Sequence, residues 1–214
     1  MRQPKSHFSK NYVSGILKQY DKSNPSEKIT VRTTVLINSD KSFISRKNFS
    51  GHITASAFVL DRTLSKILLV QHKNLNKYIQ PGGHVDETDE SIHSAARREL
   101  EEETGFAGGT FVPLNKAFPD IPIDIDIHTI PENSKKQEPE HIHVDFRYVF
   151  ILENDNQGKI SEEEIGDIVW KPISEFERMN SDTGRAVQKI NKLISERRDE
   201  LFFDSVVRTF SLGL

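Results

Sequence analysis

The 214-residue sequence contains no cysteine. The chain can therefore form no disulfide, thiolate zinc site, iron–sulfur cluster or cysteine nucleophile. It also lacks any apolar run that approaches the about 18 residues of a transmembrane helix. The beginning of the sequence, MRQPKSHFSKNYVSG, has no apolar core of the signal-peptide kind. We therefore expect a soluble, cytoplasmic protein with no membrane partner.

An excess of charge of one sign is also missing. The sequence has 29 basic and 32 acidic residues, for a net charge of −3. A nucleic-acid partner is therefore not expected, although these totals leave a local basic patch open. With 35% hydrophobic residues the chain can bury a core, and its length suits one domain with or without an extension.

Residues 1–50 differ in pattern from the rest of the chain. The segment YVSGILKQY, residues 12–20, has the spacing of a short amphipathic helix. Residues 24–27 read NPSE, which is the layout of a helix start with an Asn cap and Pro in the first turn. The β-branched segment after it suits helix or strand, and the start signal favours helix. We predict a helical extension over residues 1–50 that packs on a main domain over residues 51–214.

The main domain alternates apolar strand patterns with helical ones. A helix is predicted over residues 91–104, ending at Gly105, and another over residues 183–198. The polar segment ENSKKQEPE, residues 132–140, is predicted to be a loop. The predicted strands are ITASAFVLD, KILLVQH, PIDIDIHTI, HIHVDFRYVFIL and DIVWKPI. This order predicts an α/β domain.

The helix at residues 91–104 carries an unfavourable acidic face. On a helical wheel one face holds Ile92, Ala95, Ala96, Glu99, Glu102 and Glu103. Like charges three or four residues apart cost about 0.2–0.5 kcal/mol per pair, and these acids lie at the negative end of the helix dipole. A divalent cation held by hard oxygen ligands, Mg²⁺ or Mn²⁺, would remove the conflict. A solvated acidic face is the alternative.

The segment that includes this helix, PGGHVDETDESIHSAARRELEEETGF, resembles the box motif of the Nudix hydrolases. That motif reads Gly, five residues, Glu, seven residues, then Arg-Glu-apolar-x-Glu-Glu-x-Gly-apolar. Seven residues after Glu90, residues 98–106 match every specified position. The box runs from Gly83 to Phe106 with six residues, not five, between Gly83 and Glu90. We place the extra residue in the loop before Glu90, where it alters which loop carbonyl faces the metal.

The resemblance implies a Nudix-type α/β/α sandwich, with a mixed β-sheet between the box helix and the C-terminal helix. It also implies a hydrolase that uses Mg²⁺ or Mn²⁺ to cleave a pyrophosphate bond in a nucleoside diphosphate linked to another group. The substrate classes that stay open are nucleoside triphosphates, ADP-ribose and sugar nucleotides, dinucleoside polyphosphates and capped RNA. The alternative is an inactive Nudix-fold module that senses a nucleotide. Homodimers are frequent in the family, and the sequence leaves this open.

The resemblance also assigns roles to individual residues. The implied metal ligands are Glu99, Glu102, Glu103 and the carbonyl of Gly82. Arg98 would orient the acids and pair with Glu90 as a brace at the helix start. The general base lies on the box helix or on a later loop in this family, so its candidates are Glu103, Glu102 and Glu164. For Glu164 the alternative is an exposed acidic turn.

Polar residues alternate along the two strands that flank the 132–140 loop. One face of the later strand holds His141, His143, Asp145 and Arg147, and one face of the earlier strand holds Asp124, Asp126 and His128. We take His141, His143 and Arg147 as tentative substrate-binding residues, and a solvated sheet face is the alternative. His52 and Gln80 flank the core strands and are candidates for the pocket wall, although each is more often a satisfied structural residue.

Overall fold

A mixed β-sheet forms the centre of the protein. The computed structural model describes residues 8–38, 42–73, 76–134, 137–152, 165–177, 179 and 181–211. Its strands are β1 (His52–Asp61), β2 (Lys66–His72), β3 (Lys77–Ile79), β4 (Gly82–His84), β5 (Thr110–Val112), β6 (Asp124–Ile130), β7 (His141–Leu152) and β8 (Ile165–Pro172). Its helices are α1 (Lys10–Ser23), α2 (Ile29–Asn38), α3 (Ile92–Thr104), α4 (Ser174–Glu177) and α5 (Asp182–Ser211).

The strands join in the order β3-β2-β1-β7-β5, while β4 also pairs with β1, β6 with β7 and β8 with β2. Strands β1 and β7 are parallel over ten residue pairs, from His52 opposite His143 to Asp61 opposite Leu152. The other pairings are antiparallel. The sheet is therefore mixed, as predicted.

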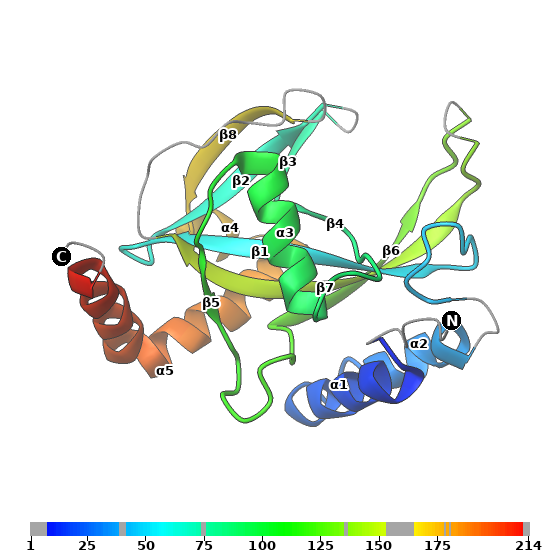
Figure 1. The fold of residues 1–214 in the computed structure, drawn as a ribbon, viewed down its shortest axis with the longest axis horizontal. Coiled ribbons are helices and arrows are strands. Elements are labelled where there is room, and N and C mark those ends of the chain that lie inside the picture. Colours follow the sequence, from blue (N-terminus) through cyan, green and yellow to red (C-terminus); the bar gives the residue numbers. More distant parts are fainter. Residues whose placement is uncertain are drawn as a thin grey trace, which may run out of the picture.

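Helices cover both faces of the sheet (Figure 1). Alternate residues of β1 and β7, such as Ala55 and Phe146, pack with α3 and the N-terminal helices in one core cluster. Residues that point the other way, such as Phe58 and Val149, pack with Ile190 and its neighbours on α5. The predicted α/β/α sandwich is confirmed, and so is the helical nature of the N-terminal segment.

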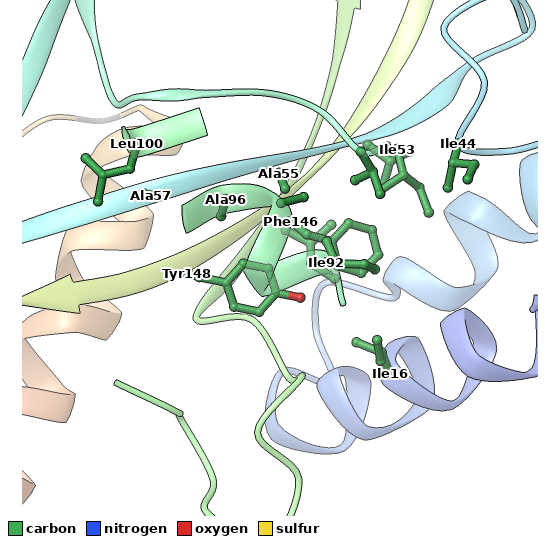
Figure 2. Packing of buried hydrophobic residues seen from close by; sticks show 14 of the residues in the cluster. Ile16, Ile44, Ile53, Ala55, Ala57, Ile92, Ala96, Leu100, Phe146 and Tyr148 are labelled. Atoms are coloured by element: carbon green, nitrogen blue, oxygen red, sulfur yellow. The ribbon is translucent and has the colours of Figure 1, made fainter. Parts of the chain in front are cut away.

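Helix α3 packs on the sheet through a buried apolar face. Ile92 and Ala96 are fully buried, and Figure 2 shows both beside Ala55 and Phe146 of the sheet. The helix begins after Ser91, whose side chain accepts from the backbone N–H of Ser94 in a capping box. It ends at Gly105, which has the left-handed φ of 67° and confirms the predicted stop.

The N-terminal helices are present, but the predicted start of the second is wrong. Residues 24–27 form a turn, and the backbone N–H and side-chain amide of Asn24 both donate to the carbonyl of Tyr20, which closes α1. Helix α2 begins at Ile29. Its first N–H groups donate to the carboxylate of Asp21 on α1, at 2.8 and 3.0 Å. A cap supplied by the preceding helix thus replaces the local one.

Strand β4 lies in the Gly-rich segment before α3 and pairs with β1 through Gly83 opposite Ala55 and His84 opposite Thr54. Helix α5 runs beyond the predicted end at residue 198 and bends at Arg197, where φ is −130° (Figure 1). Among the described residues no helix is long and apolar enough to cross a membrane.

Candidate active site and its polar surroundings

The β4 backbone lies directly against the acidic end of α3. A Cβ atom on Gly83 would lie 2.6 Å from the Glu99 carboxylate, and one on Gly82 would overlap Ser56. The N–H of Gly82 donates to Oε2 of Glu103 at 3.2 Å. Any side chain at either position would collide with these neighbours, so steric exclusion explains why both residues are glycine. Gly82 and the α3 acids are brought together, as the resemblance implied.

Arg98 binds the start of α3 to its acidic end. Its Nε and Nη2 donate to the two oxygens of Asp89, both at 3.0 Å, while Nη1 donates to Glu99 at 2.8 Å and to Glu102 at 3.0 Å. Its Nη2 also donates to the carbonyl of His84 at 2.8 Å. These contacts fix the carboxylates of Glu99 and Glu102 relative to β4.

The brace partner of Arg98 is Asp89, so the predicted pairing with Glu90 is wrong. Asp89 is buried and Glu90 is exposed. Asp89 follows Gly83 by the five residues that the motif specifies. The extra residue of this chain therefore lies after the bracing acid, between Asp89 and the helix, and not before it. The backbone N–H of Asp86 donates to Asp89 at 2.8 Å and holds it in place.

The acids differ in exposure. Glu103 is 7% exposed, and the side chains of Glu99 and Glu102 are 15% and 59% exposed. Burial raises the pKa of Glu99, against the opposing hydrogen bond from Arg98, and the charge of Glu102 raises it further. We call Asp89, Glu99, Glu102 and Glu103, together with Arg98, the carboxylate cluster. Within this cluster four acids accompany one guanidinium, beside the glycine backbone of β4.

This donor set fits a hard divalent cation. The cluster offers carboxylate oxygens at several exposures, and the glycine backbone of β4 approaches them without a side chain in between. Such oxygen donors are the ligands that Mg²⁺ and Mn²⁺ prefer. The predicted loop base, Glu164, lies outside the described residues, so the choice of base stays a prediction.

The predicted polar faces of β6 and β7 meet, but they are not solvated. Asp124 pairs with Arg147 across the two strands, and Asp126 pairs with Asp145. The guanidinium of Arg147 contacts Asp124 at 3.2 Å, Asp126 at 3.0 Å and Asp145 at 3.2 Å. All four residues are at most 6% exposed. The solvated-face alternative is therefore wrong for these residues, and the placement favours a structural role for Arg147.

Side chains from α5, from α1 and from the turn after α1 contact these residues. Arg185 and Lys189 of α5 contact Asp124 at 2.9 and 2.7 Å. Lys189 also contacts Glu27 at 2.6 Å and donates to the hydroxyl of Tyr20 on α1. Burial alone would raise the pKa of Asp124, but these cations outweigh it and lower that pKa. These contacts, which we call the ion network, link the N-terminal extension to the sheet and to α5.

Five of the eight histidines gather beyond the ion network on the same face of the sheet. Ring contacts connect His52, His84, His128, His141 and His143. Strand register explains the gathering, because β1 aligns His52 with His143 and β6 aligns His128 with His143. Sequence reasoning missed His84 as a member, whereas it placed His128 on a polar strand face like that of His141 and His143. The parallel pairing of β1 with β7 brings His52 to these rings, and no local pattern signals that pairing.

Comparisons with known proteins identify the family of this chain. The family model of the NUDIX domain matches residues 51–190. The chain therefore belongs to the Nudix family, and it is an enzyme of the pyrophosphohydrolase class. It is 32% identical over 127 residues to a probable DHNTP pyrophosphohydrolase of Lactococcus lactis subsp. cremoris (strain MG1363), a match that covers 59% of this chain and 70% of that protein.

Two solved structures share the fold. One is a binary complex of a C. elegans Ap4A hydrolase, with a TM-score of 0.50 and 16% identity, covering 67% of this chain and 98% of that one. The other is the E. coli dihydroneopterin triphosphate pyrophosphohydrolase, with a TM-score of 0.50 and 14% identity, covering 64% and 92%. At these identities the likeness concerns the fold alone.

Proposed function

We propose that this chain hydrolyses a phosphoanhydride bond of a nucleotide-like triphosphate and requires Mg²⁺ or Mn²⁺. The observation that carries the proposal is the carboxylate cluster, in which Glu103 accepts from the N–H of Gly82 and Glu99 occupies the place of a Cβ atom on Gly83. The ligands would be Glu99, Glu102, Glu103 and the carbonyl of Gly82. A cation held there would neutralise phosphate charge and lower the pKa of a bound water.

The protein's own groups would perform the remaining work. Arg98 holds Glu99 and Glu102 in place through Nη1, so their positions need not reorganise during the reaction. A carboxylate of the active site accepts the proton of the attacking water. Glu103 and Glu102 are the helix candidates for that base, and Glu164 is the loop candidate. His141 and His143 stay candidates for substrate contact.

Dihydroneopterin triphosphate is the first substrate to test. The supporting observation is the 32% identity to the L. lactis protein, whose name is that of a DHNTP pyrophosphohydrolase. Cleavage would release pyrophosphate and leave a monophosphate. A dinucleoside polyphosphate such as Ap4A is the second candidate, and it rests only on the fold of the nematode hydrolase.

A phosphate-release screen tests the proposal. Purified protein with Mg²⁺ or Mn²⁺ is given dihydroneopterin triphosphate, nucleoside triphosphates, ADP-ribose, sugar nucleotides and Ap4A, and added pyrophosphatase reveals released pyrophosphate. Glu103→Gln serves as the blank, and a chelator serves as the metal control. Turnover of one class that vanishes in both controls supports the proposal. Turnover that persists in Glu103→Gln or in chelator contradicts the metal assignment.

A further inference from the structure

Three imidazoles of the histidine group converge on one point. The ligand atoms of His52, His141 and His143 all lie within 4.8 Å of one another. The Nε2 atoms of His141 and His143 are 3.2 Å apart. Two nitrogens bound to one tetrahedral Zn²⁺ at 2.0–2.1 Å would be about 3.3 Å apart. The observed separation is that of a hydrogen bond between the two rings, and it equals the spacing of two ligands of a single ion once both Nε2 atoms are deprotonated.

Backbone carbonyls orient two of these rings. Nδ1 of His52 is 3.3 Å from the carbonyl of Asn48, and Nδ1 of His141 is 2.7 Å from the carbonyl of Pro139. A carbonyl oxygen only accepts, so each Nδ1 carries the proton and each Nε2 presents its lone pair. Metal-binding histidines are usually fixed in this way, with the second nitrogen donating to a carbonyl or carboxylate.

The Nε2 atom of His52 has no hydrogen-bond partner within the described part of the chain. His52 is 0% exposed, and this nitrogen is buried. A buried acceptor without a partner costs roughly 1–3 kcal/mol, so its retention requires an explanation. The atom belongs to the same ring that packs against His141 and His143, with centroids 5.1 and 4.6 Å apart. A ligand in the group would satisfy it.

A fourth imidazole lies beside these three rings. The ring of His84 stacks on that of His52 with centroids 5.0 Å apart and lies beside the three as a candidate fourth ligand.

From this geometry we propose that His52, His141 and His143 bind a divalent transition-metal ion of the Zn²⁺ class. Borderline-soft imidazole nitrogens select Zn²⁺, Co²⁺, Ni²⁺ or Cu²⁺ over Mg²⁺, whereas the carboxylate cluster offers only hard oxygens. The two sites are therefore chemically distinct. They share β4, because the carbonyl of His84 accepts from Arg98 of the carboxylate cluster. The inference goes beyond the proposed hydrolysis and does not depend on it.

Metal titration of the full chain tests this site. Chelator-treated protein is dialysed into excess Mg²⁺, and Zn²⁺ binding is followed by calorimetry and Co²⁺ binding by visible absorption. We expect one equivalent to bind with nitrogen ligation. The variants His143→Gln and His141→Asn should weaken Zn²⁺ binding by about 100-fold or more. The matched control His72→Gln, on β2 and outside the group, should bind as the native chain does, and so should Glu103→Gln.

Two results would overturn the proposal. One is Zn²⁺ affinity that is unchanged in both histidine variants, and the other is a Zn²⁺ equivalent that disappears in Glu103→Gln alone. A raised KM in His141→Asn with unchanged Zn²⁺ affinity would instead assign that ring to the substrate. Circular dichroism confirms that each variant is folded. If His141→Asn fails to fold, Zn²⁺ binding by His143→Gln is the deciding measurement, because His143 is only partly buried.

Discussion

The carboxylate cluster and the ion network differ in how many cations accompany their acids. The cluster sets Asp89, Glu99, Glu102 and Glu103 against Arg98. The network sets five acids against Arg147, Arg185 and Lys189, and the acids are Glu27, Asp124, Asp126, Asp145 and Asp182. His128 also contacts Asp126 at 2.8 Å, and that contact raises the pKa of the imidazole. The cluster is therefore left more negative than the network.

This difference separates binding from structural roles better than burial does. Glu103 and Asp126 are almost equally buried, at 7% and 6% exposed. Asp126 has two guanidinium groups within 3.6 Å, those of Arg147 and Arg185. Glu103 accepts from the backbone N–H of Gly82 and lies on the same helix end as Glu99 and Glu102. Neutralised carboxylates hold elements together, whereas carboxylates in excess favour a cation from solution.

The largest effect should come from Glu103→Gln. The substitution keeps the side-chain volume and removes a charge from the carboxylate cluster, so we expect metal-dependent turnover to fall by roughly 10³-fold, about 4 kcal/mol in activation free energy. Thermal unfolding should change little, because the loss of like-charge repulsion offsets the altered hydrogen bond from Gly82. Steady-state kinetics and a melting curve on the same preparation measure both quantities.

The matched control is Glu101→Gln on the same helix, outside the cluster as we define it. Its turnover should stay near that of the native chain. Equal losses in the two variants would mean that general helix charge, and not a ligand, determines activity.

Asp124→Asn should show the reverse pattern, with stability reduced and chemistry intact. Asp124 is 0% exposed and lies within 3.2 Å of Arg147, Arg185 and Lys189. Removing its charge leaves these cations short of a partner, so we expect unfolding to become easier by about 3–5 kcal/mol. Urea denaturation measures this loss. Per folded molecule, turnover should be unchanged, and a loss of turnover at full folding would place the ion network in the active site.

The acidic end of α3 could be predicted from sequence because its signals are local. Helical spacing alone places Ile92 and Ala96 on the buried side and continues that side to Glu103, as the structure confirms. Gly105 marks the end of the helix through its left-handed backbone. The one local error concerns Asp89 and Glu90. Two adjacent acids in a loop differ only in which way their side chains point, and the sequence pattern does not encode that.

The ion network and the histidine group could not be predicted, because long-range pairing builds them. Alternation places Arg147 and His143 on one strand face, but the burial of that face depends on α5 packing over it. Lys189 and Tyr20 lie 169 residues apart in sequence and are joined by a hydrogen bond of 2.6 Å. His52 reaches His143 only through the parallel register. Such contacts follow from topology, which one sequence does not show.

Asp89→Asn and Glu90→Gln together test which acid pairs with Arg98. Asp89 receives two charged hydrogen bonds from Arg98 in a buried position, so its substitution should reduce stability by about 2–3 kcal/mol. Glu90 is exposed, and its substitution should leave stability unchanged. Chemical denaturation of the pair gives the comparison directly. A larger loss for Glu90→Gln would support the predicted pairing of Arg98 with Glu90.

The smallest predicted effect is a pH dependence that has opposite signs in the two regions. Burial alone would raise the pKa of Asp126, but the hydrogen bond from His128 and the charge of Arg147 lower it from 3.8 to about 2. Its stabilisation, about 2 kcal/mol, should be complete above pH 3.8 and disappear as the pH falls towards 2. The pKa of Glu99 is raised, so its contribution to the metal-free chain should decrease as the pH rises past 4.5. Urea midpoints are measured against pH. In Asp126→Asn the loss of stability below pH 3.8 should disappear, and in Glu99→Gln the loss above pH 4.5 should disappear. Two pH dependences of the same sign would mean that Glu99 is neutralised like Asp126, and the distinction between the regions would then fail.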